Sequence, residues 1–198
     1  MLLQNYADVS QGSFLSRIKE APSDESIKVA LYTMKEMNES LGVEYYRSKE
    51  KPQDVYVLKE RYHELPTTKE GMVLINLQSH QAVAVRKEHT GKLVPSNFAI
   101  IEPFDSTVDV TYLEWFINEH PSCRKQLRIA TQGTVVAALS IKMLRELNLQ
   151  LPTVNKQKMI GNMNRVLERK KRLINERLKL EELLIKQLSI NYLKEEVK

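Results

Sequence analysis

Three polar segments of this chain carry the side-chain types that proteins use to read DNA bases. They are residues 13–19, residues 45–51, and the run NLQSHQ between two apolar segments. Asn and Gln can pair bidentately with adenine, whereas Arg and Lys bond guanine or the phosphates that fix the register. Sequence-specific reading of double-stranded DNA is the chemistry that these types could perform. The candidate DNA-binding residues are Arg17, Arg47, Lys49, Asn76, Gln78, His80 and Gln81.

A solvated turn explains each of these residues, taken singly, equally well, because surface loops are polar by default. The basic run RKKR at residues 169–172 also has two interpretations. It could contact phosphates, but a charged face on a solvated helix is the commoner meaning of such a run. Only the clustering of amides in NLQSHQ favours base reading over an ordinary turn.

Signatures of common enzymes are missing from the sequence. It contains no GxxxxGK[ST], GxGxxG, GxSxG or HExxH motif. Cys123 is the only cysteine, and its neighbour His120 lacks further ligands at a spacing that suits zinc. We therefore expect no catalytic residues, no metal site and no cofactor in this chain. A self-contained nuclease or methyltransferase is disfavoured for the same reason.

Positive charge is concentrated near the C-terminus. Residues 151–198 contain twelve Lys and Arg against six Asp and Glu, a net +6, while the whole chain carries +5. The first 150 residues are thus nearly neutral, unlike a protein that coats nucleic acid through many phosphate contacts. The first twelve residues show no secretory signal, and the longest apolar runs are far shorter than the roughly 20 residues of a membrane span. We expect a cytoplasmic protein.

The first 150 residues alternate short β-type runs with turns, which predicts an α+β domain containing a mixed or antiparallel sheet. Two stretches, residues 110–118 and 140–147, have helical spacing of their apolar residues. The expected strands are residues 28–33, 54–58, 72–77, 82–86 and 98–102.

From about residue 155 to 196 the sequence contains no proline and is dense in Leu, Lys, Glu and Arg, which predicts one helix about 60 Å long. Its apolar stripe is interrupted at Lys170, Lys171 and Glu181, so an irregular helix–helix interface is favoured over a strict leucine zipper. We divide the chain into a recognition domain, residues 1–152, and a pairing helix, residues 153–198. The predicted dimerisation residues are Met163, Leu167, Ile174, Leu178, Leu184 and Leu188.

Several ordered segments resemble the target-recognition domain of type I restriction-modification specificity (S) subunits. The segment at residues 133–163 is similar to the junction at the end of that domain, where a Gly-led loop, a short helix and a Leu-Pro segment precede a Gln near the start of a long helix. The Gln is Gln157 in this chain. The upstream segments that match in order are YADVSQG, EGMVLINL, GKLVPSNFAIIEP and DVTYLEWFIN.

The resemblance implies a noncatalytic subunit that recognises a DNA half-site. Full-length relatives carry two recognition domains and two long antiparallel helices, so a chain with one of each implies a homodimer or a pair with another half subunit, reading a bipartite target. The implied partners are DNA, modification (methyltransferase) subunits, which bring S-adenosylmethionine, and possibly restriction subunits. The alternative is a truncated or regulatory S-like protein that docks on modification subunits without reading DNA.

Overall fold

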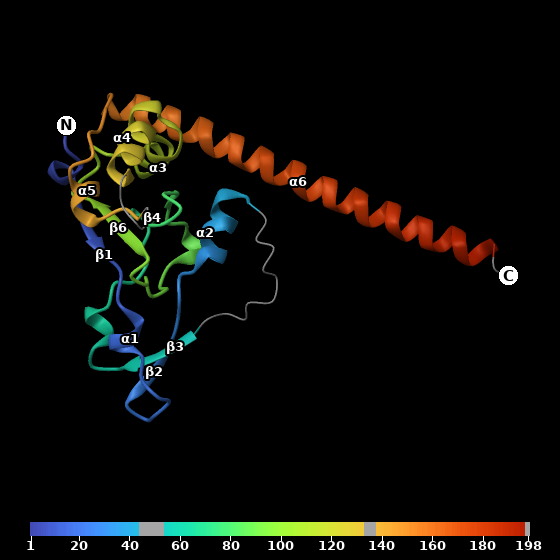
Figure 1. Cartoon of the computed structure of the whole chain (residues 1–198), viewed down its shortest axis with the longest axis horizontal. Helices are drawn as coiled ribbons and strands as arrows, with labels where there is room; N and C mark the ends of the chain where they lie inside the picture. Colours follow the sequence, from blue (N-terminus) through green and yellow to red (C-terminus); the bar gives the residue numbers. More distant parts are fainter. Residues whose placement is uncertain (44–53, 133–137, 197–198) are drawn as a thin grey trace.

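The computed structural model describes residues 1–43, 54–132 and 138–196. One long helix leaves a domain of sheets and shorter helices and extends far beyond it (Figure 1). The strands are β1 (Ala7–Gln11), β2 (Ser26–Ala30), β3 (Asp54–Leu58), β4 (Val73–Asn76), β5 (Ala82–Ala84) and β6 (Phe98–Pro103). The α-helices are α1 (Leu15–Ile18), α2 (Met34–Leu41), α3 (Val110–Glu119), α4 (Pro121–Thr131), α5 (Ile141–Arg145) and α6 (Val154–Glu196).

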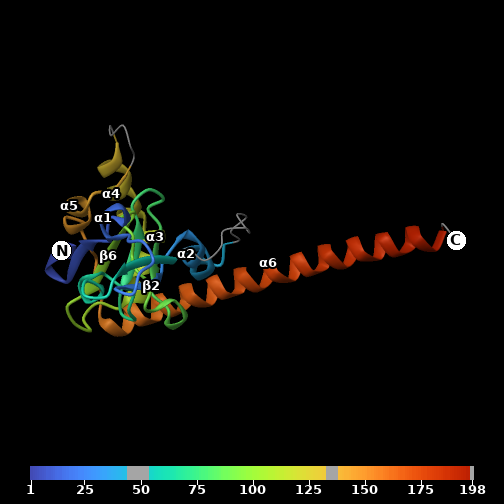
Figure 2. The same ribbon diagram turned by 90° about the horizontal axis from the view of Figure 1, so that it is seen from below.

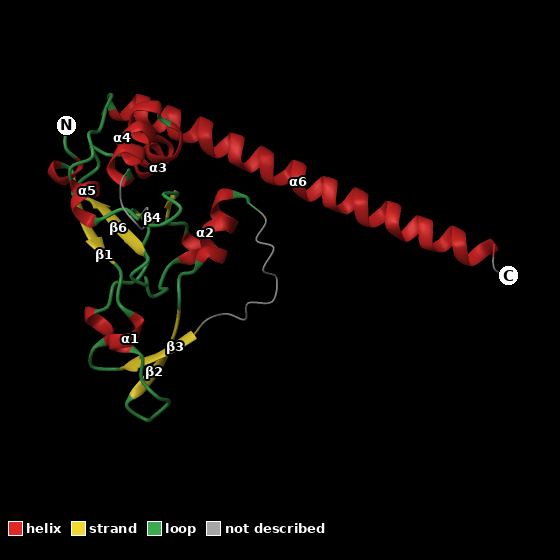
Figure 3. Ribbon diagram, in the orientation of Figure 1, coloured by secondary structure: helices red, strands yellow, loops and turns green. Residues whose placement is uncertain are grey.

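The central sheet is antiparallel, with strand order β1-β6-β4-β5, and β2 pairs with β3 in a separate two-stranded sheet (Figure 3). Strand β6 lies between β1 and β4, so that Ile101 faces Val9 on one side and Val73 on the other. The β2–β3 sheet packs with α1 around a small core of its own, which includes Val29, Val57 and Leu93.

Side chains of the central sheet alternate between two cores. Val73, Ile75 and Ile101 pack with α3, α4 and α5 on one face. Leu74 and Ile100 pack with α2 on the other. Because helices cover both faces, every residue of β4 is buried, and burial of this apolar surface is the main stabilising term for the domain.

Helix α3 covers the edge of the central sheet that is formed by β5. The Asn118 side chain accepts a hydrogen bond from the Ala82 amide at 2.8 Å and donates one to the Ala82 carbonyl at 2.7 Å. One turn earlier, the Glu114 carboxylate accepts a hydrogen bond from the backbone of Ala84. These two side chains satisfy backbone groups of β5 that an uncovered edge strand would offer to another chain.

The first four turns of α6 belong to the packing of the domain. Gln157 is 1% exposed; its Oε1 accepts a hydrogen bond from the Asp109 amide, and its Nε2 donates to the carbonyls of Thr107 and Pro152. Gly161 lies directly against α3, since a Cβ there would lie 2.0 Å from Thr111 Oγ1. From residue 169 to residue 193 every side chain of α6 is exposed.

The predicted α+β class, antiparallel sheet and long C-terminal helix are confirmed. Each of the five predicted strands overlaps an observed strand, and both predicted shorter helices are present. The sequence interpretation missed β1, α1, α2 and α4. Residues 120–123, interpreted as an ordinary loop, instead form the start of α4, with Pro121 in its first turn and Cys123 buried beneath it.

Candidate nucleic-acid interface

The turn between β4 and β5 contains four of the predicted DNA-binding residues. Asn76 is 3% exposed, and its Oδ1 accepts hydrogen bonds from the amides of Gln78 and Ser79 at 3.0 and 2.8 Å. His80 adopts a left-handed backbone conformation with φ 59°. Asn76 therefore shapes the turn from inside, and the turn presents an exposed Gln78 and half-buried His80 and Gln81.

The other predicted DNA-binding residues lie elsewhere. Arg17 is exposed on α1, with its guanidinium 4.9 Å from the centre of the Phe14 ring. Helix α1 lies beside the β2–β3 sheet, well separated from α4 and the start of α6 in Figure 1. Arg47 and Lys49 lie outside the described residues. The structure thus does not bring Arg17 together with the β4–β5 turn.

Helix α4 carries a basic surface that the sequence interpretation missed. Arg124, Lys125 and Arg128 are exposed, the helix contains no acidic residue, and none of the three forms an ion pair with another described residue. Cys123 and Leu127 anchor the opposite side of α4 in the core. The signal in the sequence is the run PSCRKQLRIAT, which has proline in the first turn and two buried apolar residues four apart.

The basic surface of α4 lies at the same end of the domain as the β4–β5 turn. Asn118, which bonds both backbone groups of Ala82, is only three residues before the start of α4. On the other side, the Leu139 amide, which follows α4 in the chain, donates a hydrogen bond to the Leu77 carbonyl at 2.9 Å. The segments on both sides of α4 are therefore bonded to the two ends of the β4–β5 turn.

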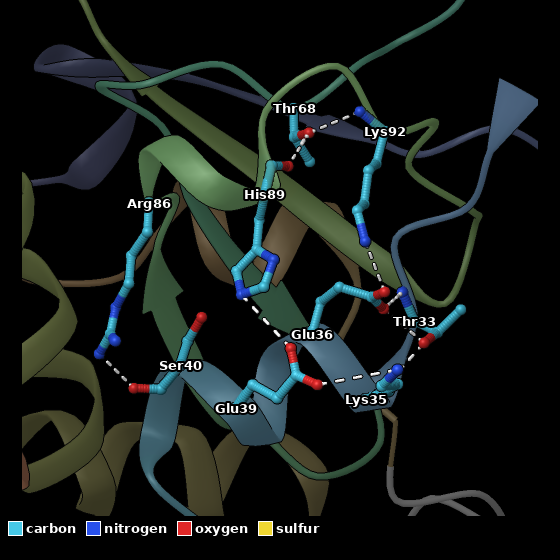
Figure 4. A network of polar contacts seen from close by, with 9 residues as sticks. All are labelled: Thr33, Lys35, Glu36, Glu39, Ser40, Thr68, Arg86, His89 and Lys92. Carbon is cyan, nitrogen blue, oxygen red and sulfur yellow. Dashed lines mark hydrogen bonds and ion pairs between the residues drawn. The ribbon is translucent and has the colours of Figure 1, made fainter. Parts of the chain in front are cut away.

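A polar network holds α2 against the segment that follows β5 (Figure 4). Lys92 Nζ donates to Glu36 Oε1 at 2.6 Å, while Thr33 and Glu36 form the capping box that begins α2. Burial raises the pKa of Glu36, but the hydrogen bonds from Lys92 and Thr33 outweigh it and hold the pKa below its ordinary value. The network fixes the helix whose C-terminus leads into residues 44–53, the segment that contains Arg47 and Lys49.

The same network fixes the C-terminal half of α2. His89 Nε2 lies 3.9 Å from Glu39 Oε2, and Arg86 donates to the carbonyl of Ser40. Burial lowers the pKa of His89, which favours the neutral ring. The helix then ends at Gly42, which has φ 69° and lies against Arg172 of α6. Helix α2 is thereby fixed both to the sheet and to the long helix.

Two carboxyl groups are enclosed where α6 crosses the domain, in a cleft of about 720 Å³ lined by α3, α6 and the segment after β5. Burial raises the pKa of Glu114 to about 7, although the Ala84 hydrogen bond and the charges of Arg86 and Arg165 oppose the shift. Burial also raises the pKa of Glu168, whose Oε2 has no hydrogen-bond partner among the described residues. The cleft is a polar contact between helix and domain.

Helix α6 also has exposed apolar side chains along its length, of which Ile174 and Leu178 line a second cleft beside the end of α2. The six predicted dimerisation residues are between 46% and 67% exposed. Leu173, Leu180 and Ile185 are also more than half exposed. Despite these residues, no helix in the described ranges has the length and hydropathy that a membrane span requires. An exposed apolar stripe of this length calls for a partner surface.

No family model and no curated protein sequence matches the chain. Solved structures do match. A chain of a type I restriction-modification system, solved to explain its assembly and conformational transition, aligns with a TM-score of 0.57 and 14% identity, over 95% of this chain and 42% of that one. The S subunit of a type I system from M. genitalium aligns with a TM-score of 0.57 and 12% identity, over 95% and 43%.

The HsdS subunit from Thermoanaerobacter tengcongensis gives a TM-score of 0.51 at 13% identity, over 89% of this chain and 38% of that one. The chain therefore spans about two fifths of the length of the proteins that it matches. These similarities cover both the domain and the long helix. The resemblance predicted from the sequence is confirmed at the level of the fold: this chain has the architecture of part of a type I restriction-modification S subunit.

Proposed function

We propose that this chain is a noncatalytic DNA-specificity subunit of a type I restriction-modification system. Its domain recognises one half-site, and α6 joins it to a second copy or to another half subunit. The assembled pair reads a bipartite target and recruits modification subunits, which bring S-adenosylmethionine, and possibly restriction subunits. The observation that carries the proposal is an S-subunit fold in which the helix that leaves the domain keeps an apolar surface exposed.

In this proposal the β4–β5 turn contacts base edges and α4 contacts phosphates. Gln78 and Gln81 offer amides that can pair with base edges, whereas Arg124, Lys125 and Arg128 offer charges that suit phosphates. Asn76 is removed from the set of contacts, because its side chain is buried and engaged by the turn. Arg17, Arg47 and Lys49 remain proposed contacts on other parts of the surface.

Two matched variants separate base reading from phosphate binding. Replacing Arg124, Lys125 and Arg128 with Ala should weaken binding to all duplexes alike and reduce the slope of log K against log salt by up to about 3. Replacing Gln78 and Gln81 with Ala should instead reduce the preference for the target over random duplex and leave the salt slope unchanged. Lys142→Ala, on exposed α5, is the control for removing a surface charge.

A second candidate uses the same helix. An S-like assembly protein that docks on modification subunits without reading DNA would also need the exposed stripe of α6. Both candidates predict that the Gln78→Ala, Gln81→Ala variant still assembles with modification subunits. Only the specificity subunit predicts that a preferred DNA sequence exists and is lost in this variant. Titration of target and scrambled duplexes, with assembly followed by size-exclusion chromatography, distinguishes the two.

A further inference from the structure

The cleft between α6, α3 and the segment after β5 is lined by a cluster of cations. Arg165, Arg169 and Arg172 follow one another at steps of four and three residues, which places them on one flank of α6. Arg86 and Lys87 line the cleft from the domain side. Figure 2 shows α6 running along the domain before it extends away from it. Five cations therefore surround a cavity of about 720 Å³.

The fold divides the basic run RKKR at residues 169–172. Its two arginines, Arg169 and Arg172, line this cleft. Lys171 lines the second cleft, beside the end of α2. Lys170 lies about 100° around the helix from Arg169 and is exposed. The run is therefore not one uniform solvated face, because its arginines share a site with Arg165.

Most cations of the cleft are not neutralised by neighbouring carboxylates. Among the residues that the structure describes, Lys87, Arg165, Arg169 and Arg172 form no salt bridge. Arg86 donates a hydrogen bond to the Ser40 carbonyl, which is a neutral acceptor. Like charges three and four residues apart destabilise a helix, so an anion in the cleft would relieve this repulsion.

Buried polar groups that lack partners line the same cleft. Glu168 Oε2 is buried and has no hydrogen-bond partner in the described part of the chain. Asn164 is only 9% exposed, and its side chain forms no hydrogen bond with another described residue. Glu114 is also buried, and its carboxylate accepts one hydrogen bond, from the Ala84 backbone. Buried polar groups usually have partners, and a ligand in the cleft can supply them.

The two carboxyl groups can act as hydrogen-bond donors. Burial raises the pKa of Glu114 to about 7 and also raises the pKa of Glu168, against the opposing charge of Arg86. Besides the five cations, the charged or titratable residues that line the cleft or act on these groups are Glu70, Glu88, Glu119, Lys171 and Tyr32. A protonated carboxyl donates to an anion and adds no negative charge to the cleft.

We propose that this cleft binds a compact, multiply charged phosphate ligand. Guanidinium groups bond phosphate oxygens bidentately, and five cations suit an anion with more than one charge. The volume lies within the roughly 300–1,000 Å³ of small-ligand sites. The phosphate comes either from a free compound, such as a nucleotide, or from a DNA backbone that passes the mouth of the cleft. The proposal does not depend on base reading by the β4–β5 turn.

Calorimetric titration of the full chain with pyrophosphate tests the site. The Arg165→Ala, Arg169→Ala variant should bind pyrophosphate at least about tenfold more weakly, because it loses charge-assisted hydrogen bonds. The matched control is Lys170→Ala, Lys186→Ala, which removes two exposed charges from other parts of α6 and should bind like the wild-type chain. Circular dichroism checks that each variant is folded. Absence of binding by the wild-type chain, or an equal loss in the control, would overturn the proposal.

The pH dependence of binding gives an independent readout. Wild-type affinity should fall by up to about tenfold from pH 6 to pH 8, because binding at the higher pH requires proton uptake by the carboxyls. The Glu114→Gln, Glu168→Gln variant has amide donors at every pH and should lose less. Ionisation of pyrophosphate is common to both proteins and cancels from the comparison. Equal losses would place the anion outside the cleft and contradict the proposal.

Competition with a random DNA duplex identifies the source of the phosphate. Displacement of pyrophosphate, with weaker duplex binding by the Arg165→Ala, Arg169→Ala variant, would assign the site to the DNA backbone. Unchanged duplex binding by this variant would assign the site to a free phosphate compound. Either result supports a phosphate site, and neither requires that the chain prefer a DNA sequence.

Discussion

Glu114 shows how one polar residue can have a structural role that its sequence context hides. It lies among apolar residues of α3, yet its carboxylate bonds the edge of the sheet and faces α6. Burial raises its pKa from 4.5 to about 7. Between these pH values the folded chain holds a proton that the unfolded chain releases. The free energy of unfolding therefore falls as pH rises through this window.

Glu114→Gln should remove this contribution while keeping an oxygen for the Ala84 amide. We expect the variant to be more stable than the wild-type chain at pH 8, by at most about 3 kcal/mol, and equally stable near pH 4.5. Urea unfolding of both proteins from pH 4.5 to 8 measures the difference between their free energies of unfolding. The contribution of His89 changes with pH in the opposite sense, but it is common to both proteins and cancels from this difference. Glu102→Gln, on the exposed side of β6, is the control. A constant difference across this range would contradict the assignment.

For other individual residues, the sequence predicted the local structure better than the contacts of each side chain. The polar run NLQSHQ correctly indicated a turn, but residue type alone could not separate Asn76, which is buried in the turn, from Gln78, which is exposed. That distinction depends on the backbone of the turn, because the amides of Gln78 and Ser79 use the Asn76 side chain as their acceptor. Arg124, Lys125 and Arg128 were missed because their helix was interpreted as a loop.

At the scale of elements, the long helix was the most predictable feature because helix propensity and periodicity agree over its whole length. Strands β2 to β6 were also identified, since apolar runs bounded by turns identify buried strands. Helix α2 was missed because its one face buries little more than Met37, and its stability depends on capping and on the Lys92 ion pair. Such tertiary contacts leave no periodic pattern.

The contact of α6 with α3 depends on the absence of a side chain at Gly161. In Gly161→Ala the new methyl group would lie 2.0 Å from Thr111 Oγ1 and 2.9 Å from its carbonyl carbon, so the helices must separate. We expect a loss of about 1–3 kcal/mol in the free energy of unfolding, even though Ala favours helix. Asn162→Ala, one residue along on the exposed side, should be neutral or stabilising. Equal thermal midpoints for both variants would show that this contact is loose.

At the scale of the whole molecule, the fold has the α+β domain and the long C-terminal helix that the sequence predicted. The boundary drawn at residue 153 stays a prediction. The first four turns of α6 pack into the domain through Gln157, Gly161 and Asn164, so the helix begins as part of the core. In the proposed pair, the fixed start of α6 on the domain means that the length of the paired helices sets the distance between the two half-sites.

Selection from a pool of random duplexes, with the chain and its modification subunit present, tests the central claim most directly. We predict enrichment of one interrupted sequence with two-fold symmetry. The Gln78→Ala, Gln81→Ala variant, which should assemble normally, is predicted to lose this enrichment. If the wild-type complex binds DNA but enriches no sequence, the chain does not supply specificity and the account is contradicted.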